Sequence, residues 1–353
     1  MPVLQQKPIE HLAVTASSDD PILLCAADEN YVRPLTVMLH SAAMSMRVGG
    51  ELNVVLLDGG ISDSSLSGIA DSLNGLSVNL YVIRPGLDDV DDLMTSHHIT
   101  HTAYLRLLAA RILPDAIEKV IYLDSDVLVN DDLTQLWEMP MGENYCLAVT
   151  DVSCPFVDAR EVREERIQAA KPYMNMLLPI GNWKALGIDG RANYFNSGVM
   201  VLNLKLWRRD NVEEQLLRCL RQNQSWVWCW DQYALNVVFS GRWGKLPLRW
   251  NQGMHAFEYP DASLAPFDTG EFEAMRDRPA IVHFTTEFKP WDFEPFHPLR
   301  SKFYEQLDQT AFKGWRPENP GFRLRTWWDR KVIRLIRAWL IQWRKIKLKF
   351  AQI

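Results

Sequence analysis

The stretch that decides the fold is VIYLDSDVLV, residues 120–129, in which large apolar residues lead into two aspartates one residue apart. The four consecutive apolar residues 120–123 predict a strand that is buried on both faces, as in a parallel sheet covered by helices. Ligands of such sheets bind at the carboxyl ends of the strands, and Asp124 and Asp126 lie at that end. If the backbone stays extended, their side chains point to the same side, because the strand period is two.

Two carboxylates on one side of a strand end form half of a site for a hard cation. Mg²⁺ and Mn²⁺ prefer oxygen ligands, and proteins commonly hold them with one or two carboxylates together with substrate phosphates. We therefore interpret Asp124 and Asp126 as ligands of a metal that binds a diphosphate. The alternative is a polar strand end without a ligand, since aspartate pairs at this spacing occur by chance in many proteins.

The first part of the chain predicts a parallel α/β sheet. Residues 21–31 begin with an apolar strand, and alternating helices and strands are predicted after it at residues 31–46, 51–57, 61–73 and 78–83. The small side chains of Ala26 and Ala27 allow a flat ring to approach the backbone, and Asp28 and Asn30 offer groups for its edge or for a ribose. An ordinary helix cap at Asp28 is the alternative.

Residues 97–113 contain a histidine cluster and a predicted helix. The three histidines of HHITH, residues 97–101, could present only two side chains on one helical face, so a histidine metal site is disfavoured. We assign His98 to the polar wall of a binding cleft. Residues 102–113 predict an amphipathic helix that ends before Pro114 and places Arg106 within reach of a phosphate; a solvated surface position is the alternative.

Further polar candidates follow apolar runs in the second half of the chain. Residues 194–204 predict a second strongly apolar strand that begins beside Asn196. The tryptophan-rich run 226–230 predicts a core segment, and Asp231 and Gln232 follow it at the start of a helix. A short strand at 281–284 contains His283, and Lys289 comes six residues later; the imidazole is a candidate third metal ligand that suits Mn²⁺, although a structural histidine is the alternative.

Composition indicates a soluble globular protein of one large domain or two. The chain has 353 residues, of which 47% are hydrophobic and 23% charged. Five cysteines without C-x-x-C spacing argue against a disulfide framework and a structural zinc. The sequence shows no run of eighteen apolar residues and no signal peptide, so we expect a cytoplasmic protein.

The last part of the chain, residues 323–353, differs from the rest in charge. It carries ten Lys or Arg residues and one acid, Asp329, a net charge of +9; since the whole chain is −6, the remainder carries −15. Tryptophans and aliphatic residues alternate with the basic ones, which predicts an amphipathic helix at a membrane interface. Packing on the domain's own core and a nucleic-acid patch are the alternatives; no nucleic-acid partner is expected.

Six stretches resemble, in order, the motifs of glycosyltransferase family 8: AADENY, TAYLR, YLDSDVLV, YFNSGVMVLNLKLWR, WDQYALN and HFTTEFKPW. The likeness is greatest to bacterial lipooligosaccharide or lipopolysaccharide galactosyl- and glucosyltransferases. It implies a GT-A fold, with a mainly parallel central sheet and helices on both faces. The implied organisation is an N-terminal extension (residues 1–20), a nucleotide-binding part (about 21–150), an acceptor part (about 151–300) and a helical tail (301–353). The tail is basic and amphipathic from residue 323.

The resemblance also implies an activity. The expected reaction is retaining transfer of galactose or glucose from a UDP-sugar to a saccharide or glycolipid acceptor, with Mn²⁺ or Mg²⁺, in cell-surface glycan synthesis at the inner face of the cytoplasmic membrane. Implied donor-binding residues are Ala26, Ala27, Asp28, Asn30, Arg106, Asp124, Ser125 and Lys289. Implied metal ligands are Asp124, Asp126 and His283; implied catalytic residues around the transferred sugar are Asn196, Asp231 and Gln232; implied acceptor-side residues are His98 and Asp151.

One position departs from the family pattern. The family motif near the end is histidine, two residues, glycine, two residues, lysine, and Thr286 stands at the glycine position, where a side chain could displace a phosphate-binding loop. Two other functions are open: a catalytically silent UDP-sugar-binding or membrane scaffold protein, and a nucleotidyltransferase. The presence of both aspartates, His283 and Lys289 argues against the first, and the lack of a basic Gly-rich phosphate loop argues against the second.

Overall fold

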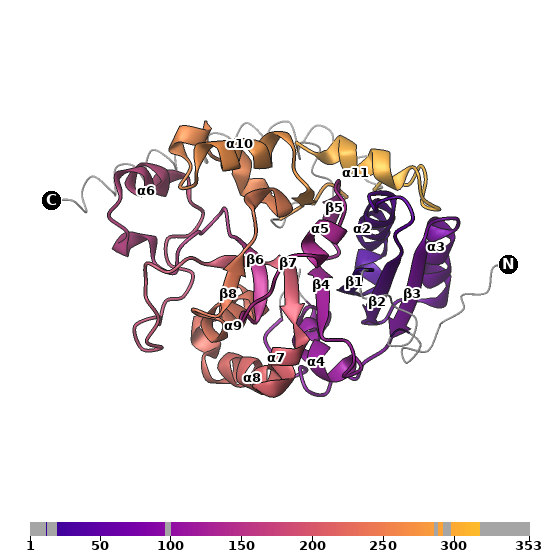
Figure 1. The fold of residues 1–353 in the computed structure, drawn as a ribbon, viewed down its shortest axis with the longest axis horizontal. Coiled ribbons are helices and arrows are strands. Elements are labelled where there is room, and N and C mark those ends of the chain that lie inside the picture. The colour runs from indigo at the N-terminus through magenta and orange to yellow at the C-terminus, as the bar shows by residue number, and fades with distance from the viewer. Residues whose placement is uncertain (1–11, 13–19, 96–99, 286–288, 292–297, 318–353) are drawn as a thin grey trace.

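The computed structural model describes residue 12 and residues 20–95, 100–285, 289–291 and 298–317 (Figure 1). The predictions for His98, Thr286 and the basic tail concern residues outside these ranges. In the described part, no helix is both long enough and apolar enough to cross a membrane.

Among the described residues, ten strands form two sheets. They are β1 (Ile22–Ala27), β2 (Leu52–Asp58), β3 (Val78–Ile83), β4 (Lys119–Leu123), β5 (Val127–Val129), β6 (Cys146–Thr150), β7 (Phe195–Asn203), β8 (Trp243–Lys245), β9 (Gln252–Gly253) and β10 (Ile281–His283). The large sheet has seven strands in the order β3-β2-β1-β4-β7-β6-β8. All its pairs are parallel except those of β7, which runs antiparallel to β4 and β6. The predicted mainly parallel sheet is therefore confirmed.

The described part of the chain contains ten α-helices of four residues or more. They are α2 (Val32–Met44), α3 (Asp63–Leu73), α4 (Ala109–Ile112), α5 (Thr134–Trp137), α6 (Glu165–Ala170), α7 (Leu204–Arg209), α8 (Val212–Gln222), α9 (Trp230–Val238), α10 (Thr269–Asp277) and α11 (Arg300–Leu307). Helix α2 contacts α3 and α11, whereas α7 contacts α4 and α8, and α9 contacts α8 and β7. Figure 1 shows α2 and α3 beside β1, β2 and β3, with α11 above them, and α4, α7 and α8 at the lower end of β4 and β7.

Strand β4 lies at the centre of the large sheet, between β1 and β7. Residues 120–123 are all buried, as the unbroken apolar run predicts. Beyond Leu123 the chain turns and enters β5, which belongs to the small sheet with the order β5-β10-β9. The backbone therefore does not stay extended through Asp124 and Asp126, because a turn carries the chain from one sheet to the other.

Two local predictions also need correction. The tryptophan-rich run lies mostly in the connection between α8 and α9, so Trp226 and Trp228 are 44% and 67% exposed and are not core residues. The segment around Arg106 is a 3-10 helix, His101–Leu108, followed by the short α4. Positions three apart lie on one side of such a helix. Arg106 accordingly folds back, and its Nε donates to the carbonyl of Ala103 at 3.0 Å.

We expect Ile121→Ala to lower the free energy of unfolding by about 2–5 kcal/mol, because it leaves a cavity in fully buried β4. The matched control is Val48→Ala, since Val48 is an exposed aliphatic residue and its loss should change the free energy by less than about 0.5 kcal/mol. Urea unfolding followed by circular dichroism measures both. Equal midpoints for the two variants would contradict the placement of β4 at the centre of the core.

Candidate functional site

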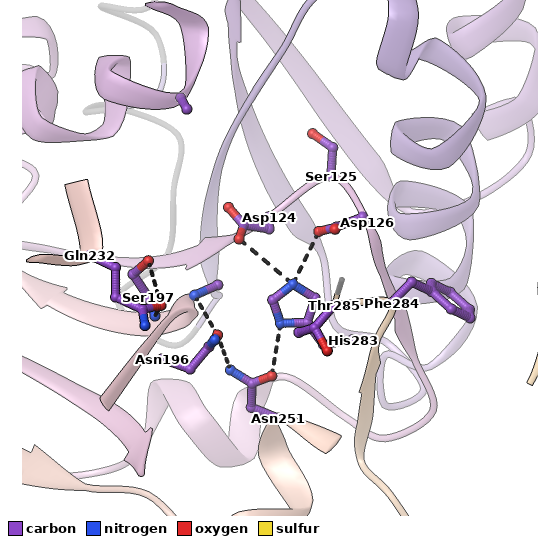
Figure 2. A network of polar contacts seen from close by, with 12 residues as sticks. Asp124, Ser125, Asp126, Asn196, Ser197, Gln232, Asn251, His283, Phe284 and Thr285 are labelled. Atoms are coloured by element: carbon purple, nitrogen blue, oxygen red, sulfur yellow. Dashed lines mark hydrogen bonds and ion pairs between the residues drawn. The ribbon is translucent and has the colours of Figure 1, made fainter. Parts of the chain in front are cut away.

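His283 lies beside the two aspartates because β10 pairs antiparallel with β5, with His283 opposite Val127. Its Nε2 lies 3.2 Å from Asp126 Oδ1 and 3.8 Å from Asp124 Oδ2 (Figure 2). One potential ligand atom from each of the three residues lies within 4.8 Å of the others. Two carboxylates and one imidazole therefore converge on one point, which is a donor set for a divalent cation.

Gly198 of β7 provides the space for this cluster. Asp124 N donates to the Gly198 carbonyl at 2.8 Å, so the two backbones are in direct contact. A Cβ atom at Gly198 would lie 2.2 Å from His283 Cε1 and 2.7 Å from Asp124 Oδ2. No side chain fits there without displacing one of the two ligands.

Asp126 faces a nitrogen-bearing side chain at each oxygen. Lys289 Nζ lies 2.6 Å from Asp126 Oδ2 and also donates to the carbonyl of Phe284, while Asp126 Oδ1 faces His283. Burial alone would raise the pKa of Asp126, but the Lys289 ammonium opposes that effect, and the pKa lies well below the usual range. Asp126 is therefore held as a carboxylate, the form that binds a cation.

Arg106 connects Asp124 with Asp231 from a buried position, so the alternative of a solvated surface residue does not hold. Its Nη2 lies 2.8 Å from Asp124 Oδ1, and its Nε lies 3.2 Å from Asp231 Oδ2. The guanidinium also stacks over the ring of Tyr122. Burial raises the pKa of Asp231 to about 6 even though Arg106 opposes the shift.

A set of hydrogen bonds joins the predicted sugar-side residues. Asp151 Oδ2 accepts from Asn196 Nδ2 and from Gln232 Nε2, each at 3.1 Å. Gln232 Oε1 in turn accepts from the backbone N–H of Ser197 at 3.0 Å (Figure 2). The side chains of Asn196, Asp151 and Gln232, from β7, the end of β6 and α9, therefore form one group.

The predicted donor-binding residues of β1 line a smaller cavity of about 100 Å³. Ser125 Oγ donates to the carbonyl of Ala26 at 2.7 Å and ties the aspartate turn to β1. Asp28 accepts from the Asn30 backbone N–H and from Thr100 Oγ1. Asp28 therefore caps the short 3-10 helix Glu29–Tyr31, as the alternative interpretation of this residue stated. It also lines the cavity, whereas Asn30 lies exposed beside it.

A larger cavity of about 440 Å³ adjoins the first. Both are lined by Tyr31, Arg106, Asp124 and Asp126. The larger cavity is also lined by the remaining predicted site residues that the structure describes, namely Asp151, Asn196, Asp231, Gln232, His283 and Lys289. The cation cluster therefore lies where the two cavities meet.

Sequence reasoning missed several residues that line the cavities. Tyr122 and Thr100 line the smaller cavity, and Asn251 and His255 line the larger one. Asn251 directly follows Arg249 and Trp250. The only feature of the sequence that could have pointed to Asn251 as a site residue is its position after a strand-like stretch.

Comparisons with known proteins agree with this geometry. The sequence pattern of glycosyl transferase family 8 matches residues 22–294. General stress protein A of Bacillus subtilis (strain 168) is 25% identical over 293 residues, which cover 82% of this chain and 94% of that protein. Glycosyltransferase GlyF of Streptococcus pneumoniae is 22% identical over 289 residues, 81% of this chain and 61% of that protein.

Among solved structures, the galactosyltransferase LgtC in complex with donor and acceptor sugar analogs superposes with a TM-score of 0.63 at 25% identity. The match covers 84% of this chain and 98% of that one. The fold and the site together define a glycosyltransferase of GT-A fold. The chain belongs to glycosyl transferase family 8, which implies a nucleotide-sugar donor and a saccharide acceptor.

We expect Gly198→Ala to weaken Mn²⁺ binding by at least about 10-fold, because the added methyl group displaces His283 or Asp124. The matched control is Gly86→Ala, whose Cβ would have 3.7 Å of clearance from Asp88 Oδ2. Electron paramagnetic resonance of free Mn²⁺ gives both dissociation constants. Unchanged affinity in Gly198→Ala would place the cation elsewhere.

Proposed function

We propose that the protein is a retaining hexosyltransferase that moves galactose or glucose from a UDP-sugar to a saccharide or glycolipid acceptor. The observation that carries the proposal is the convergence of Asp124, Asp126 and His283 at the junction of two cavities. A nucleotide diphosphate bound at this junction would have its nucleoside on one side and its sugar on the other. Synthesis of lipopolysaccharide or another cell-surface glycan is the proposed role.

The donor set fits a divalent cation, with Mn²⁺ proposed and Mg²⁺ as the second choice. Carboxylates suit both ions, while an imidazole favours Mn²⁺. When bound, the cation supplies Lewis-acid stabilisation of the negative charge that develops on the leaving diphosphate. Asp124, Asp126 and His283 would hold it.

Lys289 and Arg106 are proposed to bind the diphosphate and to neutralise its charge. Lys289 already lies at the cluster, 2.6 Å from Asp126. Arg106 lines both cavities and is fixed by two carboxylates and the ring of Tyr122. Preorganised cations of this kind stabilise the departure of an anionic group more than protonation would.

On the sugar side, Asp231 is proposed to orient the hydroxyls of the transferred hexose, with Asn196 beside it. Gln232 is a poor nucleophile for chemical and geometric reasons. Its Oε1 accepts from Ser197 and its Nε2 donates to Asp151, so both ends of the amide are engaged. This favours attack by the acceptor hydroxyl from the side of departure, with the leaving phosphate as base, over a covalent glycosyl-enzyme intermediate.

The acceptor is proposed to enter through the larger cavity beside Asp151. The uracil and ribose are proposed to bind in the smaller cavity at Ala26, Ala27 and Asp28, with Asn30 and Ser125 next to them. These assignments follow from which residues line which cavity.

We expect Asp126→Ala to lower UDP release from UDP-galactose or UDP-glucose by about 10²-fold or more in the presence of Mn²⁺, because the site loses a cation ligand. The control is Asp91→Ala, which removes an exposed aspartate away from both cavities. Equal turnover by Asp126→Ala and the unmodified protein would remove the cation from the mechanism. Donor binding without UDP release in the unmodified protein would instead favour the catalytically silent alternative.

The basic tail is proposed to bind the cytoplasmic membrane at its inner face. We expect a chain that ends at Gly321 to lose binding to vesicles with anionic lipid, because it loses the +9 segment. Zwitterionic vesicles are the control and should bind the intact chain weakly. Unchanged binding after truncation, measured by co-sedimentation, would contradict an interfacial tail.

A further inference from the structure

Asn251 is a buried amide that contacts the candidate metal ligand His283 from the side opposite the aspartates. Its Oδ1 lies 2.9 Å from His283 Nδ1, and its Nδ2 donates to Asn196 Oδ1 at 2.9 Å. Figure 2 shows Asn251 between the imidazole and Asn196. Only 3% of Asn251 is exposed, so water does not compete for these contacts.

The direction of this chain of hydrogen bonds is set by a backbone group. The Gly198 N–H donates to the side chain of Asn196 at 3.0 Å, and a backbone N–H can only donate. The acceptor atom on Asn196 must therefore be its carbonyl oxygen. The Asn251 atom that faces the same oxygen must then be its NH₂ group, because two carbonyl oxygens at that distance would repel each other.

The consequence reaches the imidazole. With its NH₂ group directed at Asn196, Asn251 presents its carbonyl oxygen to His283 Nδ1, which must carry a proton in order to donate. In the neutral ring, Nε2 then has the free lone pair, and Nε2 is the atom that faces Asp124 and Asp126. The ring is thereby fixed in the one tautomer that can bind a cation at the cluster.

We propose that Asn251 is a positioning residue that fixes the Nδ1–H tautomer of His283 through the Gly198–Asn196–Asn251 chain of hydrogen bonds. Outer groups that orient a metal-binding imidazole commonly change metal affinity by about 10- to 100-fold when they are removed. The proposal rests on the proposed function in one respect, which is that a divalent cation binds at the cluster. The Asn251 acceptor at Nδ1 is present with or without a cation, so the neutral ring can be examined in the metal-free protein.

The same chain links the cation cluster to the sugar-side group. Asn196 uses its oxygen for Gly198 and Asn251 and its NH₂ group for Asp151 Oδ2 at 3.1 Å. A rotation of the Asn251 amide would therefore disturb both His283 and Asn196. The position of the metal ligand and that of the group facing the sugar are set by one amide.

The first test is the ¹⁵N spectrum of the full-length, metal-free protein labelled at histidine, recorded under alkaline conditions in which the ring is neutral. The eight histidines require assignment, which the loss of signals in His283→Gln provides. We expect a protonated Nδ1 and an unprotonated Nε2 at His283. A protonated Nε2 in the unmodified protein would overturn the proposal without any substitution at Asn251.

The second test compares two substitutions by the affinity for Mn²⁺ alone, measured by electron paramagnetic resonance. Asn251→Ala removes the acceptor for Nδ1–H, so we expect Nε2–H signal to appear in the ¹⁵N spectrum and Mn²⁺ affinity to fall about 10- to 100-fold. Asn251→Asp retains an oxygen acceptor for Nδ1–H but loses the donor to Asn196, so the tautomer should persist and Mn²⁺ affinity should fall clearly less than in Asn251→Ala. Asn130→Ala is the matched control, because Asn130 donates to Pro279 O beside the β5–β10 pair but outside the site.

Unchanged tautomer and Mn²⁺ affinity in Asn251→Ala would overturn the proposal. So would an equal loss of affinity in Asn251→Asp and Asn251→Ala, because a merely structural amide would tolerate neither substitution. A failure of the unmodified protein to bind Mn²⁺ would contradict the proposed metal-dependent transfer instead, and the ¹⁵N spectrum would still decide the assignment of Asn251.

Discussion

The antiparallel pairing of β10 with β5 is the interaction on which the site depends. It places His283 opposite Val127, directly after the aspartate turn, and the Phe284 N–H extends the contact by donating to Asp126 O at 3.0 Å. Apart from His283, the paired residues are buried aliphatics, so the hydrophobic effect holds the register. A slip of one residue would turn every side chain of β10 to the other face and remove His283 from the cluster. The candidate cation centre is thus a consequence of strand register.

Strand β7 supplies the second half of the arrangement through an irregularity. Its pairing with β6 shifts between Ala148 and Val149, where the partner changes from Met200 to Asn196. Residues 197–199, which lie between these two partners, do not pair with β6, although Val199 still pairs with Leu123 of β4. Such irregularities re-aim side chains next to functional sites. In this protein the irregularity brings Asn196 and the Gly198 backbone to the same place, where one shapes the sugar side and the other makes room for the metal ligands.

The sequence predicted what local patterns determine and missed what long-range contacts determine. The apolar run 120–123 is enough to predict a central strand, because burial on both faces requires such a run. The tryptophan-rich run was misjudged because its burial depends on which elements pack over the connection between α8 and α9. His283 was a candidate metal ligand from its place in a short strand, but only the family resemblance joined it to Asp124, since no spacing rule links the two residues. Asn251 was missed because its role depends on a hydrogen-bond direction fixed by Gly198, which is remote in sequence.

The charges of the site show why cation binding and diphosphate binding are coupled under the proposed function. Arg106 and Lys289 are held by the carboxylates of Asp124 and Asp126, which also form the candidate cation centre. Asp126 is buried and Asp124 is partly buried, and carboxylates withdrawn from water require a positive partner, so neither basic side chain can leave its aspartate without compensation. Positive charge at the three-ligand cluster supplies that compensation and leaves both basic groups free to bind phosphate oxygens. Diphosphate binding without a cation would instead leave buried carboxylates unpaired beside an anion, which is electrostatically unfavourable.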